Sequence, residues 1–431
     1  MRIGIIGTGY VGLVAGAGLA DFGNEVICCD KDNSKIEFLK SGGIPIYEIG
    51  LSDLMKHNIE KGRLRFSCDL RQTVDSSQVI FLAVGTPERD NGDPDLSDLM
   101  QISEEIGHYV CEYKVIAIKS TVPIGTFQQV YDNIKKNASA EFDVVSNPEF
   151  LREGAAVQDF LHPNRIVLGV STSRAEKIMR EVYRGLYLIE TPMIVTDNIT
   201  AEMIKYACNS FLAAKISFIN EIARMCDHLG ADVVTVAKAM GMDGRIGPKF
   251  LHPSPGFGGS CLTKDVAALI SMGEKAGVDL KIPKAIKEIN KGQRELVVYK
   301  AIGLLGSLSG KIIAILGLSF KSNTDDVRNS PSLEVVKLLL HEGAIIKAYD
   351  PAASDNFKKH FSQITYSPNA YEACRDTDLA IFMTEWNEFR ELDLCNLKKV
   401  MRGDALLDPR NIYMPEVAKN AGFRYAGFGR N

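Results

Sequence analysis

The chain has 431 residues, of which 45% are hydrophobic and 24% are charged, and its formal net charge at pH 7 is -4. This balance is typical of a globular protein and argues against a general nucleic-acid binder, while the length predicts two or three domains. No run of about 20 apolar residues could span a membrane. The first residues also lack the layout of a signal peptide, so we expect a cytoplasmic protein.

The first predicted elements form a βαβ unit. A strand is expected at residues 2–6, G-x-G-x-x-G follows at residues 7–12, and a helix and a second strand end at Asp30. This order is typical of a dinucleotide site, where glycines let the backbone approach a pyrophosphate at a helix N-terminus. Asp30 is expected to accept hydrogen bonds from a ribose with a free 2′-hydroxyl. We therefore predict NAD as the cofactor.

Three more strands are expected at residues 79–84, 115–118 and 142–145. The polar turns after them contain Gly85-Thr86-Pro87, Ser120-Thr121 and Asn147-Pro148-Glu149. Ordinary turn chemistry explains any one of these turns. Because ligands bind beyond the carboxyl ends of parallel strands, the three together favour the lining of a nicotinamide and substrate cleft.

The middle of the chain is expected to be helical. The predicted helices cover residues 200–229, 233–240, 262–276 and 283–305. Lys205 and Asn209 are four residues apart and share one helix face, although a solvated face is the favoured explanation of this pair taken alone. Because a helical segment between two α/β units commonly supplies a subunit interface, we expect a homodimer.

One of the nine cysteines stands apart from the others. No Cys-x-x-Cys pair occurs, so we expect reduced thiols and no metal site. Most cysteines that lie in apolar runs, such as Cys28 and Cys226, are typical of a core. Cys261 instead follows the glycine-rich stretch Phe-Gly-Gly-Ser and precedes Lys264 and Asp265. The residues around it leave open a buried thiol, a metal ligand, a redox switch or a nucleophile.

The last third repeats the opening pattern. Strands are expected at residues 311–316, 345–349 and 379–383, with Gly317 after the first and a helix at residues 332–341. Lys321 and Arg328, in the long turn after the first of these strands, suit an anionic phosphate. This pattern favours a second, degenerate nucleotide-binding unit over a purely structural α/β cap.

The predicted fold class is therefore α/β, with two Rossmann-like doubly wound domains joined by a helical connector that contains a long central helix. The expected domains are residues 1–196 for NAD binding, 197–298 for the connector with its dimer contacts and cysteine loop, and 299–431 for a different nucleotide that is attached to the substrate.

Along essentially its whole length the chain resembles the UDP-glucose/GDP-mannose dehydrogenase family. The matching stretches are GTGYVGL at residues 7–13, STVPIGT at 120–126, NPEFLREG at 147–154, EMIKYACNSFLA at 202–213, PGFGGSCLTKD at 255–265 and GLSFKSNTDDVRNSPS at 317–332. The resemblance implies an enzyme that oxidises the primary alcohol of a nucleotide sugar to a carboxylate and reduces two NAD+. Residues 244–261 are similar to those of the UDP-glucose members, which implies UDP-glucose as substrate and UDP-glucuronate, a precursor for polysaccharide biosynthesis, as product.

The resemblance also implies roles for single residues. The implied catalytic residues are Cys261 as nucleophile, Lys205, Asn209 and Asp265 for water and oxyanions, and Thr121 and Glu149 for a positioned water. The implied cofactor-binding residues are Gly7, Gly9, Tyr10, Val11, Gly12, Asp30, Lys35, Gly85, Thr86, Pro87, Ser120, Thr121, Glu153, Lys264 and Arg328. The implied substrate-binding residues are Glu149, Phe150, Leu151, Lys205, Asn209, Arg245, Phe250, Phe257, Gly258, Phe320, Lys321 and Arg410. Arg245 is implied to serve a neighbouring subunit, which again implies a dimer.

A thiol at position 261 suits a four-electron oxidation, because an aldehyde has no leaving group. The thiolate adds to the aldehyde to give a thiohemiacetal, whose oxidation gives a thioester that water cleaves. The general base is open among Lys205, Asp265 and a water held by Thr121 or Glu149.

Three alternative functions make different demands on the sequence. A GDP-mannose or UDP-N-acetylmannosamine dehydrogenase differs only in substrate. A non-catalytic NAD or nucleotide sensor has no need of a nucleophile. An epimerase would require a Tyr-x-x-x-Lys pair, for which the sequence offers no convincing candidate.

Overall fold

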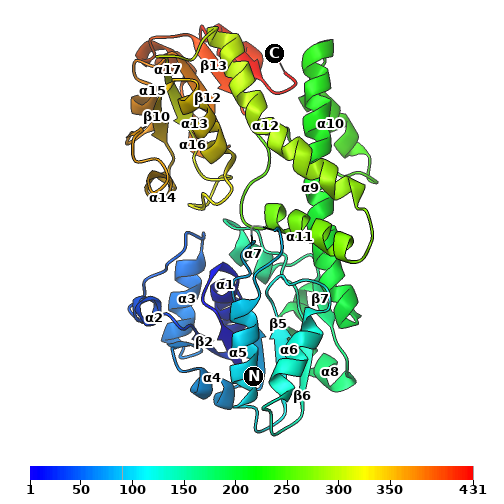
Figure 1. Ribbon diagram of the computed structural model, residues 1–431. Coiled ribbons are helices and arrows are strands. Elements are labelled where there is room, and N and C mark those ends of the chain that lie inside the picture. The colour runs from blue at the N-terminus through cyan, green and yellow to red at the C-terminus, as the bar shows by residue number, and fades with distance from the viewer. Residues whose placement is uncertain (90, 431) are drawn as a thin grey trace. The chain divides into compact units, whose positions relative to one another are not determined.

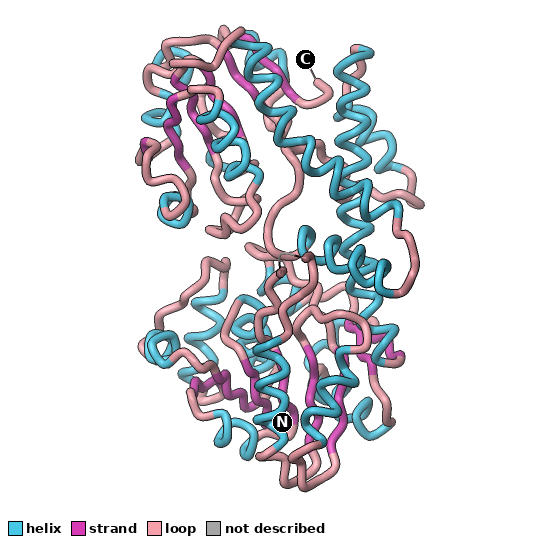
Figure 2. The backbone as a smooth tube through the Cα atoms, viewed as in Figure 1, coloured by secondary structure: helices cyan, strands magenta, loops and turns pink. Residues whose placement is uncertain are grey.

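The structure is a computed structural model that describes residues 1–89 and 91–430. The chain divides into two compact units, Met1–Cys208 and Asn209–Asn431. Each unit contains one sheet with helices packed against it (Figure 1; Figure 2). The predicted fold class is confirmed, because the chain contains two Rossmann-like α/β domains and a long central helix.

The first unit is built on an eight-stranded sheet. Its strands are β1 (Arg2–Ile6), β2 (Glu25–Cys29), β3 (Leu64–Ser67), β4 (Val79–Leu82), β5 (Lys114–Ile118), β6 (Phe142–Ser146), β7 (Ile166–Gly169) and β8 (Met193–Thr196). Their spatial order is β3-β2-β1-β4-β5-β6-β7-β8. The parallel strands β1 to β6 follow the order of a doubly wound nucleotide-binding fold. At the edge, β7 runs antiparallel to β6 and β8 runs parallel to β7.

Helices cover both faces of this sheet. They are α1 (Tyr10–Asp21), α2 (Asn33–Lys40), α3 (Leu51–Glu60), α4 (Leu70–Ser76), α5 (Ser97–Gly107), α6 (Thr126–Lys135), α7 (Ala156–Leu161), α8 (Ser173–Val182) and the 3-10 helix η1 (Arg184–Ile189). Helix α1 packs against α3 and α7 in one apolar core, and α5 packs against α6 in another. Because helices bury both faces, central strands such as β4 are apolar at every position.

Four helices lie in the range expected for the connector or overlap it. They are α9 (Asn198–Leu229), α10 (Val233–Met242), α11 (Leu262–Lys275) and α12 (Lys281–Leu305). Helix α9 has 32 residues and runs from the first unit into the second. Pro283 is tolerated in the first turn of α12, and Gly306, with φ of 77°, ends that helix. The four predicted helices are confirmed.

The second unit has a six-stranded sheet in which all strands are parallel. Its strands are β9 (Ile312–Leu316), β10 (Ile345–Tyr349), β11 (Thr365–Tyr366), β12 (Leu379–Phe382), β13 (Ala405–Asp408) and β14 (Arg424–Gly427). Its helices are α13 (Pro331–His341), α14 (Ser354–Lys358), α15 (Ala370–Cys374), α16 (Asn387–Arg390), α17 (Leu394–Val400) and α18 (Pro415–Asn420). The strand order β11-β10-β9-β12-β13-β14 repeats that of β1 to β6.

The two sheets also carry a glycine and an acid at equivalent positions. Gly7 and Gly317 follow the first strand of each sheet with φ of 98° and 100°. Asp30 and Asp350 follow the second strand. The carboxylate of Asp350 is buried and accepts hydrogen bonds from backbone N–H groups of residues 318, 319, 352 and 353 and from two side chains. The predicted second, degenerate unit is thus confirmed as a Rossmann-like fold.

Strands β3, β7, β8, β11, β13 and β14 lie outside the elements predicted from the sequence. Each has four residues or fewer. Their stability depends on pairing with a neighbour in the sheet, which a local sequence pattern does not reveal. The division into three domains at residues 196 and 298 stays a prediction.

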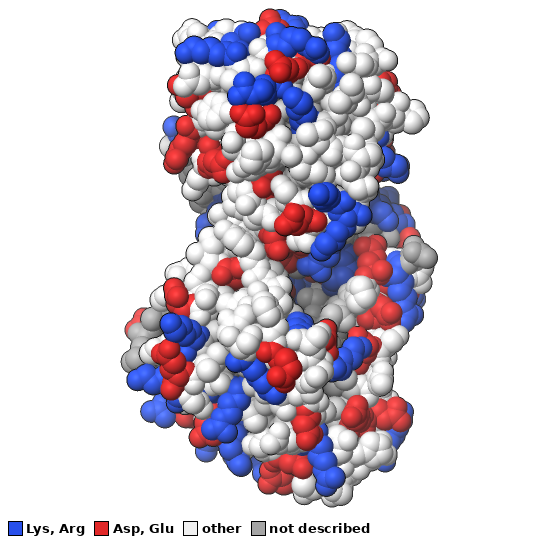
Figure 3. Space-filling model, turned by 90° about the vertical axis from the view of Figure 1, so that its left-hand side faces the viewer, with Lys and Arg blue, Asp and Glu red and all other residues white. Residues whose placement is uncertain are grey.

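The surface is charged but mixed. Acidic and basic side chains are interspersed over the face shown in Figure 3, in keeping with the small net charge. Among the described residues, no helix combines the length and apolar character required to cross a bilayer. No group of three or more His, Cys, Asp or Glu side chains in the described chain could hold a metal ion.

Candidate active site

The glycine turn after β1 has the geometry of a pyrophosphate site. A Cβ at Gly7 would lie 2.6 Å from the carbonyl oxygen of Ala83, and one at Gly12 would lie 1.8 Å from the carbonyl oxygen of Gly7. At Gly9 the same position is open among the described residues, apart from the adjacent residues of the chain, and Gly9 is the N-cap of α1 with no side-chain cap bond. The first and third glycines therefore allow a tight turn, whereas the second opens the helix N-terminus to an anion.

Asp30 lies beside this turn. Its carboxylate accepts hydrogen bonds from the Thr8 backbone N–H at 2.9 Å, from Thr8 Oγ1 at 2.7 Å and from Lys35 Nζ at 3.2 Å. Burial alone would raise the pKa of Asp30, but the hydrogen bonds from Thr8 and Asp32 and the charge of Lys35 lower it to about 2. The acid is therefore ionised at neutral pH, and its charge repels a 2′-phosphate.

The turns after β4 and β5 meet at the same edge of the sheet. Ser120 Oγ donates to the carbonyl of Val84 at 2.6 Å, and Thr86 Oγ1 donates to the carbonyl of Thr121 at 2.9 Å. The predicted residues Gly85 and Pro87 lie in the first of these turns. The structure thus brings the predicted turn residues together.

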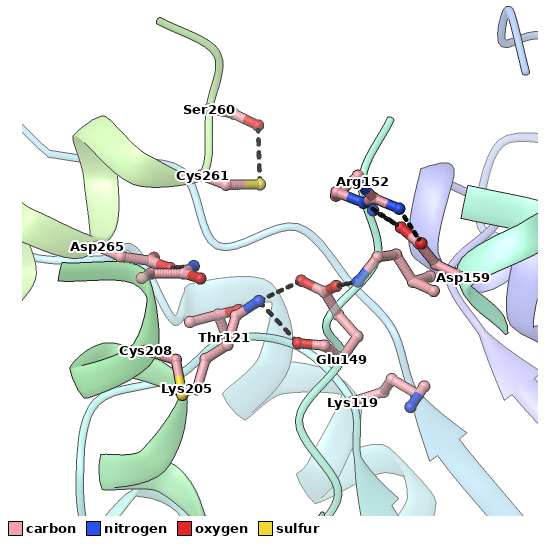
Figure 4. Close-up of polar contacts among 12 residues, drawn as sticks. Lys119, Thr121, Glu149, Arg152, Asp159, Lys205, Cys208, Ser260, Cys261 and Asp265 are labelled. Atoms are coloured by element: carbon pink, nitrogen blue, oxygen red, sulfur yellow. Dashed lines mark hydrogen bonds and ion pairs between the residues drawn. The ribbon is translucent and has the colours of Figure 1, made fainter. Parts of the chain in front are cut away.

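Glu149 and Lys205 form a buried ion pair. Lys205 Nζ donates to Glu149 Oε1 at 2.8 Å and to its backbone carbonyl at 2.7 Å, and Figure 4 shows the ammonium pointing at the carboxylate. Both side chains are at most 6% exposed. Burial would raise the pKa of Glu149, but Lys205 holds it below its usual value. The second carboxylate oxygen accepts the backbone N–H of Leu151.

Two further cations surround this pair. Burial lowers the pKa of Lys119 to about 8, and its Nζ donates to the Asn147 side chain at 3.2 Å. The guanidinium of Arg165 lies 3.6 Å from the centre of the Phe150 ring, and Lys205 Nζ lies 5.4 Å from the same centre. Phe150, which was predicted to contact substrate, is therefore held by cation–π contacts.

Cys261 lies at the N-terminal cap position of α11 in the second unit. It is exposed, forms no disulfide, and its Sγ is 3.8 Å from Ser260 Oγ (Figure 4). The backbone N–H of Asp265 bonds to its carbonyl, which closes the first helical turn. The positive end of a helix dipole favours negative charge on a sulfur atom there.

Asp265 is a buried residue in the first turn of α11, after Cys261. It is 1% exposed, and its two oxygens accept Asn209 Nδ2 at 2.6 Å and Lys264 Nζ at 2.9 Å. Asn209 is also buried and comes from α9, one turn after Lys205. Lys264 forms an ion pair with Asp265 here, while its predicted contact with the cofactor stays a prediction.

The predicted substrate residues of the second sheet lie beside the cysteine loop. A Cβ at Gly258 would meet Phe320 Cβ at 3.0 Å, and one at Gly259 would meet the Phe320 ring at 2.9 Å. Arg410 donates to the Phe320 carbonyl at 3.2 Å and forms an ion pair with Glu385 at 3.3 Å. The structure therefore gathers Gly258, Phe320 and Arg410 in one place.

The contacts described for several other predicted residues do not assign a role to them. The Arg328 guanidinium pairs with Asp326, and its backbone carbonyl accepts the N–H of Gly259. Lys321 Nζ lies 5.6 Å from the Phe320 ring centre. The Tyr10 hydroxyl donates to the Tyr47 carbonyl, and Val11 and Glu153 are partly buried. Phe250 has a φ of 66°, and Arg245 is exposed and paired with Asp243.

Two buried carboxylates that support the first unit were not predicted. Glu48 accepts the backbone N–H groups of Gly154 at 2.6 Å and Ala156 at 2.8 Å. Glu202 accepts those of Gly125 at 2.6 Å and Phe127 at 3.0 Å at the start of α6. Their partners are 75 or more residues away in the chain, so no local pattern could reveal them.

Comparison with known proteins identifies the three parts of the chain. Models of the UDP-glucose/GDP-mannose dehydrogenase family match its NAD binding domain over residues 1–187, its central domain over 199–292 and its UDP binding domain over 314–415.

The chain belongs to the UDP-glucose/GDP-mannose dehydrogenase family. The resemblance seen in the sequence is confirmed, and so are an NAD-dependent dehydrogenase and NAD as its cofactor.

Individual members of the family are similar over their whole length. The chain is 47% identical to a UDP-glucose 6-dehydrogenase of Rhizobium meliloti, with all of both chains covered. It is 44% identical to one of Bacillus subtilis, of which 93% is covered. A solved UDP-glucose dehydrogenase from Pyrobaculum islandicum is 35% identical, with a TM-score of 0.94 over all of this chain and 98% of the other.

The residues of the first unit fit NAD. The open position at Gly9 leaves room for a pyrophosphate, and Asp30 is ionised and faces the same turn. We expect Gly7, Gly9 and Gly12 to hold the pyrophosphate at the start of α1, and Asp30 to hold the adenosine ribose.

Removal of the Asp30 charge is expected to weaken discrimination against NADP. In Asp30→Ala the repulsion of a 2′-phosphate is lost, and the Lys35 ammonium no longer has the Asp30 carboxylate as its partner. Because one charged contact is lost, the ratio of kcat/KM for NAD to kcat/KM for NADP should fall at least about tenfold. The measurement is steady-state kinetics with each cofactor. Asp32→Asn, which keeps the cap of α2, serves as the control, and an unchanged ratio in Asp30→Ala would contradict the assignment.

Glu202 is expected to make stability depend on pH. Burial raises its pKa from 4.5 to about 7 despite the opposing backbone hydrogen bonds. Between these values the folded state binds more protons than the unfolded state, so the free energy of unfolding falls as pH rises. Relative to Glu202→Gln, the wild-type protein should lose on the order of a few kcal/mol between pH 4.5 and 7. Urea unfolding across this range measures the difference, and a pH-independent difference would contradict it.

Proposed function

We propose that the protein oxidises UDP-glucose to UDP-glucuronate by a four-electron reaction that reduces two NAD+ per substrate. The observation that carries this proposal is the exposed thiol of Cys261 at a helix N-terminus, next to the buried Asp265–Asn209 pair. The UDP binding domain and relatives named as UDP-glucose 6-dehydrogenases support the choice of sugar.

Cys261 serves as the nucleophile in this reaction. The primary alcohol first loses a hydride and a proton and becomes an aldehyde. The thiolate adds to the aldehyde carbon, and the thiohemiacetal loses a second hydride and proton to become a thioester. Water then cleaves the C–S bond, releasing the carboxylate and the thiol. NAD+, when bound, accepts the hydride in each oxidation.

Lys205 stabilises the oxyanions that this sequence creates. It is buried and paired with Glu149, so its ammonium is held in a defined position inside the protein. Asn209 lies one turn further along α9 and donates to Asp265, which lies in the first turn after Cys261. These connections support a role for the amide and Asp265 beside the thiol.

The thioester route predicts two NADH for each molecule of limiting UDP-glucose. A single NADH would mean that oxidation stops at the aldehyde, and none would direct the search to GDP-mannose and UDP-N-acetylmannosamine as substrates. The measurement is the absorbance of NADH at completion, with each sugar nucleotide in turn. A non-catalytic sensor would bind NAD and produce no NADH with any of them.

Two variants separate the chemical roles. Cys261→Ser should still bind UDP-glucose and stall at or within the second oxidation. Full conversion at the wild-type rate would rule out the thioester.

Lys205→Ala should lose about 2.7–4 kcal/mol of transition-state stabilisation, the usual effect of removing one oxyanion donor, in both oxidations.

We also propose a homodimer that forms through α9. Phe211, Phe218 and Met225 recur every seven residues along this helix and are 67%, 50% and 59% exposed. An apolar stripe with this period is typical of a helix that packs against another helix. Together with an Arg245 that is exposed and available to a neighbour, it supports a second copy of the chain as the partner.

Sedimentation equilibrium is expected to give twice the chain mass for the wild-type protein. Phe218→Glu should shift the protein to the monomer, because a charge in an apolar interface is costly. The exposed Glu221→Gln on the same helix is the control, and it should leave the dimer intact. A wild-type monomer would contradict the proposal.

A further inference from the structure

The loop that precedes Cys261 is buried although it contains three glycines. Residues 253–259 are all buried, and Gly256 and Gly259 have φ of 98° and 80°, which only glycine adopts readily. The Gly259 N–H donates to the Arg328 carbonyl at 3.0 Å, and its own carbonyl accepts Thr263 Oγ1 at 2.7 Å. A buried loop must pair its peptide groups with donors and acceptors from elsewhere.

The Phe257 peptide obtains those partners from one side chain on α12. Asn290 Oδ1 accepts the Phe257 N–H at 2.8 Å, and Asn290 Nδ2 donates to the Phe257 carbonyl at 3.1 Å. The amide thus bonds both polar groups of one residue, as a paired β-strand would. Asn290 is 5% exposed, so these bonds are formed away from water.

Two neighbours restrict this arrangement further. A Cβ at Gly256 would lie 2.6 Å from Asn290 Oδ1, so the absence of a side chain there allows the close approach. Arg294, one turn after Asn290, donates to the Phe257 carbonyl at 3.0 Å and also contacts the Asn290 carbonyl. Helix α12 therefore holds the Phe257 peptide through two side chains, four residues before the thiol.

We propose that Asn290 is a positioning residue for Cys261, which acts by fixing the Phe257 peptide and through it the start of α11. The inference rests on the proposed nucleophilic role of Cys261. A thiol must approach the aldehyde carbon along a defined line, and a displacement of about 1 Å can cost on the order of 100-fold in rate. The first oxidation, which needs no thiol, is independent of this placement.

The two half-reactions provide the test. In Asn290→Ala, NAD-dependent oxidation of the UDP-linked 6-aldehyde should be at least tenfold slower in kcat. Reduction of the same aldehyde by NADH reverses the thiol-independent step, and its kcat at saturating aldehyde should stay within twofold of wild type, with an unchanged KM for NADH. Asn290→Asp, which keeps an acceptor for the Phe257 N–H and loses the donor, should show the same selective loss to a smaller degree and serves if the alanine variant does not fold.

Gln293 offers a matched control on the same helix. It is buried, and both atoms of its amide have no hydrogen-bond partner among the described residues. Gln293→Met should leave both half-reactions unchanged. Equal losses in both directions, no loss in either Asn290 variant, or the same selective loss in Gln293→Met would overturn the proposal. Cys261→Ser tests the proposed function separately: oxidation of the aldehyde at the wild-type rate by that variant would refute the thioester, whatever Asn290→Ala does.

Discussion

The buried ion pair between Lys205 and Glu149 sets the main constraint on the first unit. Two charges placed inside a protein must stay together, because removal of one typically costs about 3–5 kcal/mol. Here the pair joins α9 to the turn after β6, and the Lys205 ammonium also bonds the Glu149 backbone carbonyl. The position of that turn, and of Phe150 beside it, therefore depends on where α9 lies.

In the second unit, too, buried polar groups are paired, in part with neutral and in part with charged partners. Asp265 is buried beside Cys261 and is held by Asn209 and Lys264. Asn290 provides such partners for the backbone, because its side-chain amide bonds both the N–H and the carbonyl of Phe257. The buried polar groups around the thiol thus bond to side chains on long helices, which hold them more rigidly than loops would.

The sequence allowed the fold to be predicted wherever the signal was local. The glycine turn, Asp30, the long central helix and the repeated βαβ pattern all depend on residues within about 30 positions of one another. The residues that support the site could not be predicted, because their partners are distant in the sequence. Glu48 and Glu202 bond to peptides 75 or more residues away, and Asn290 is 33 residues from Phe257. The roles of the predicted site residues stay predictions, although the structure gathers many of them at the sheet edges and around the cysteine loop.

The repeated sheets use the acid after the second strand in two different ways. In the second sheet the acid after the second strand is Asp350, whose oxygens are already engaged by six donors from its own unit, including the Trp386 indole. Such a carboxylate stabilises the fold of its own unit, and its oxygens have no free acceptor position for a sugar hydroxyl. Rebuilding the glycine turn alone therefore could not make the second sheet specific for a dinucleotide, because the six donors that bond Asp350 would also need other partners.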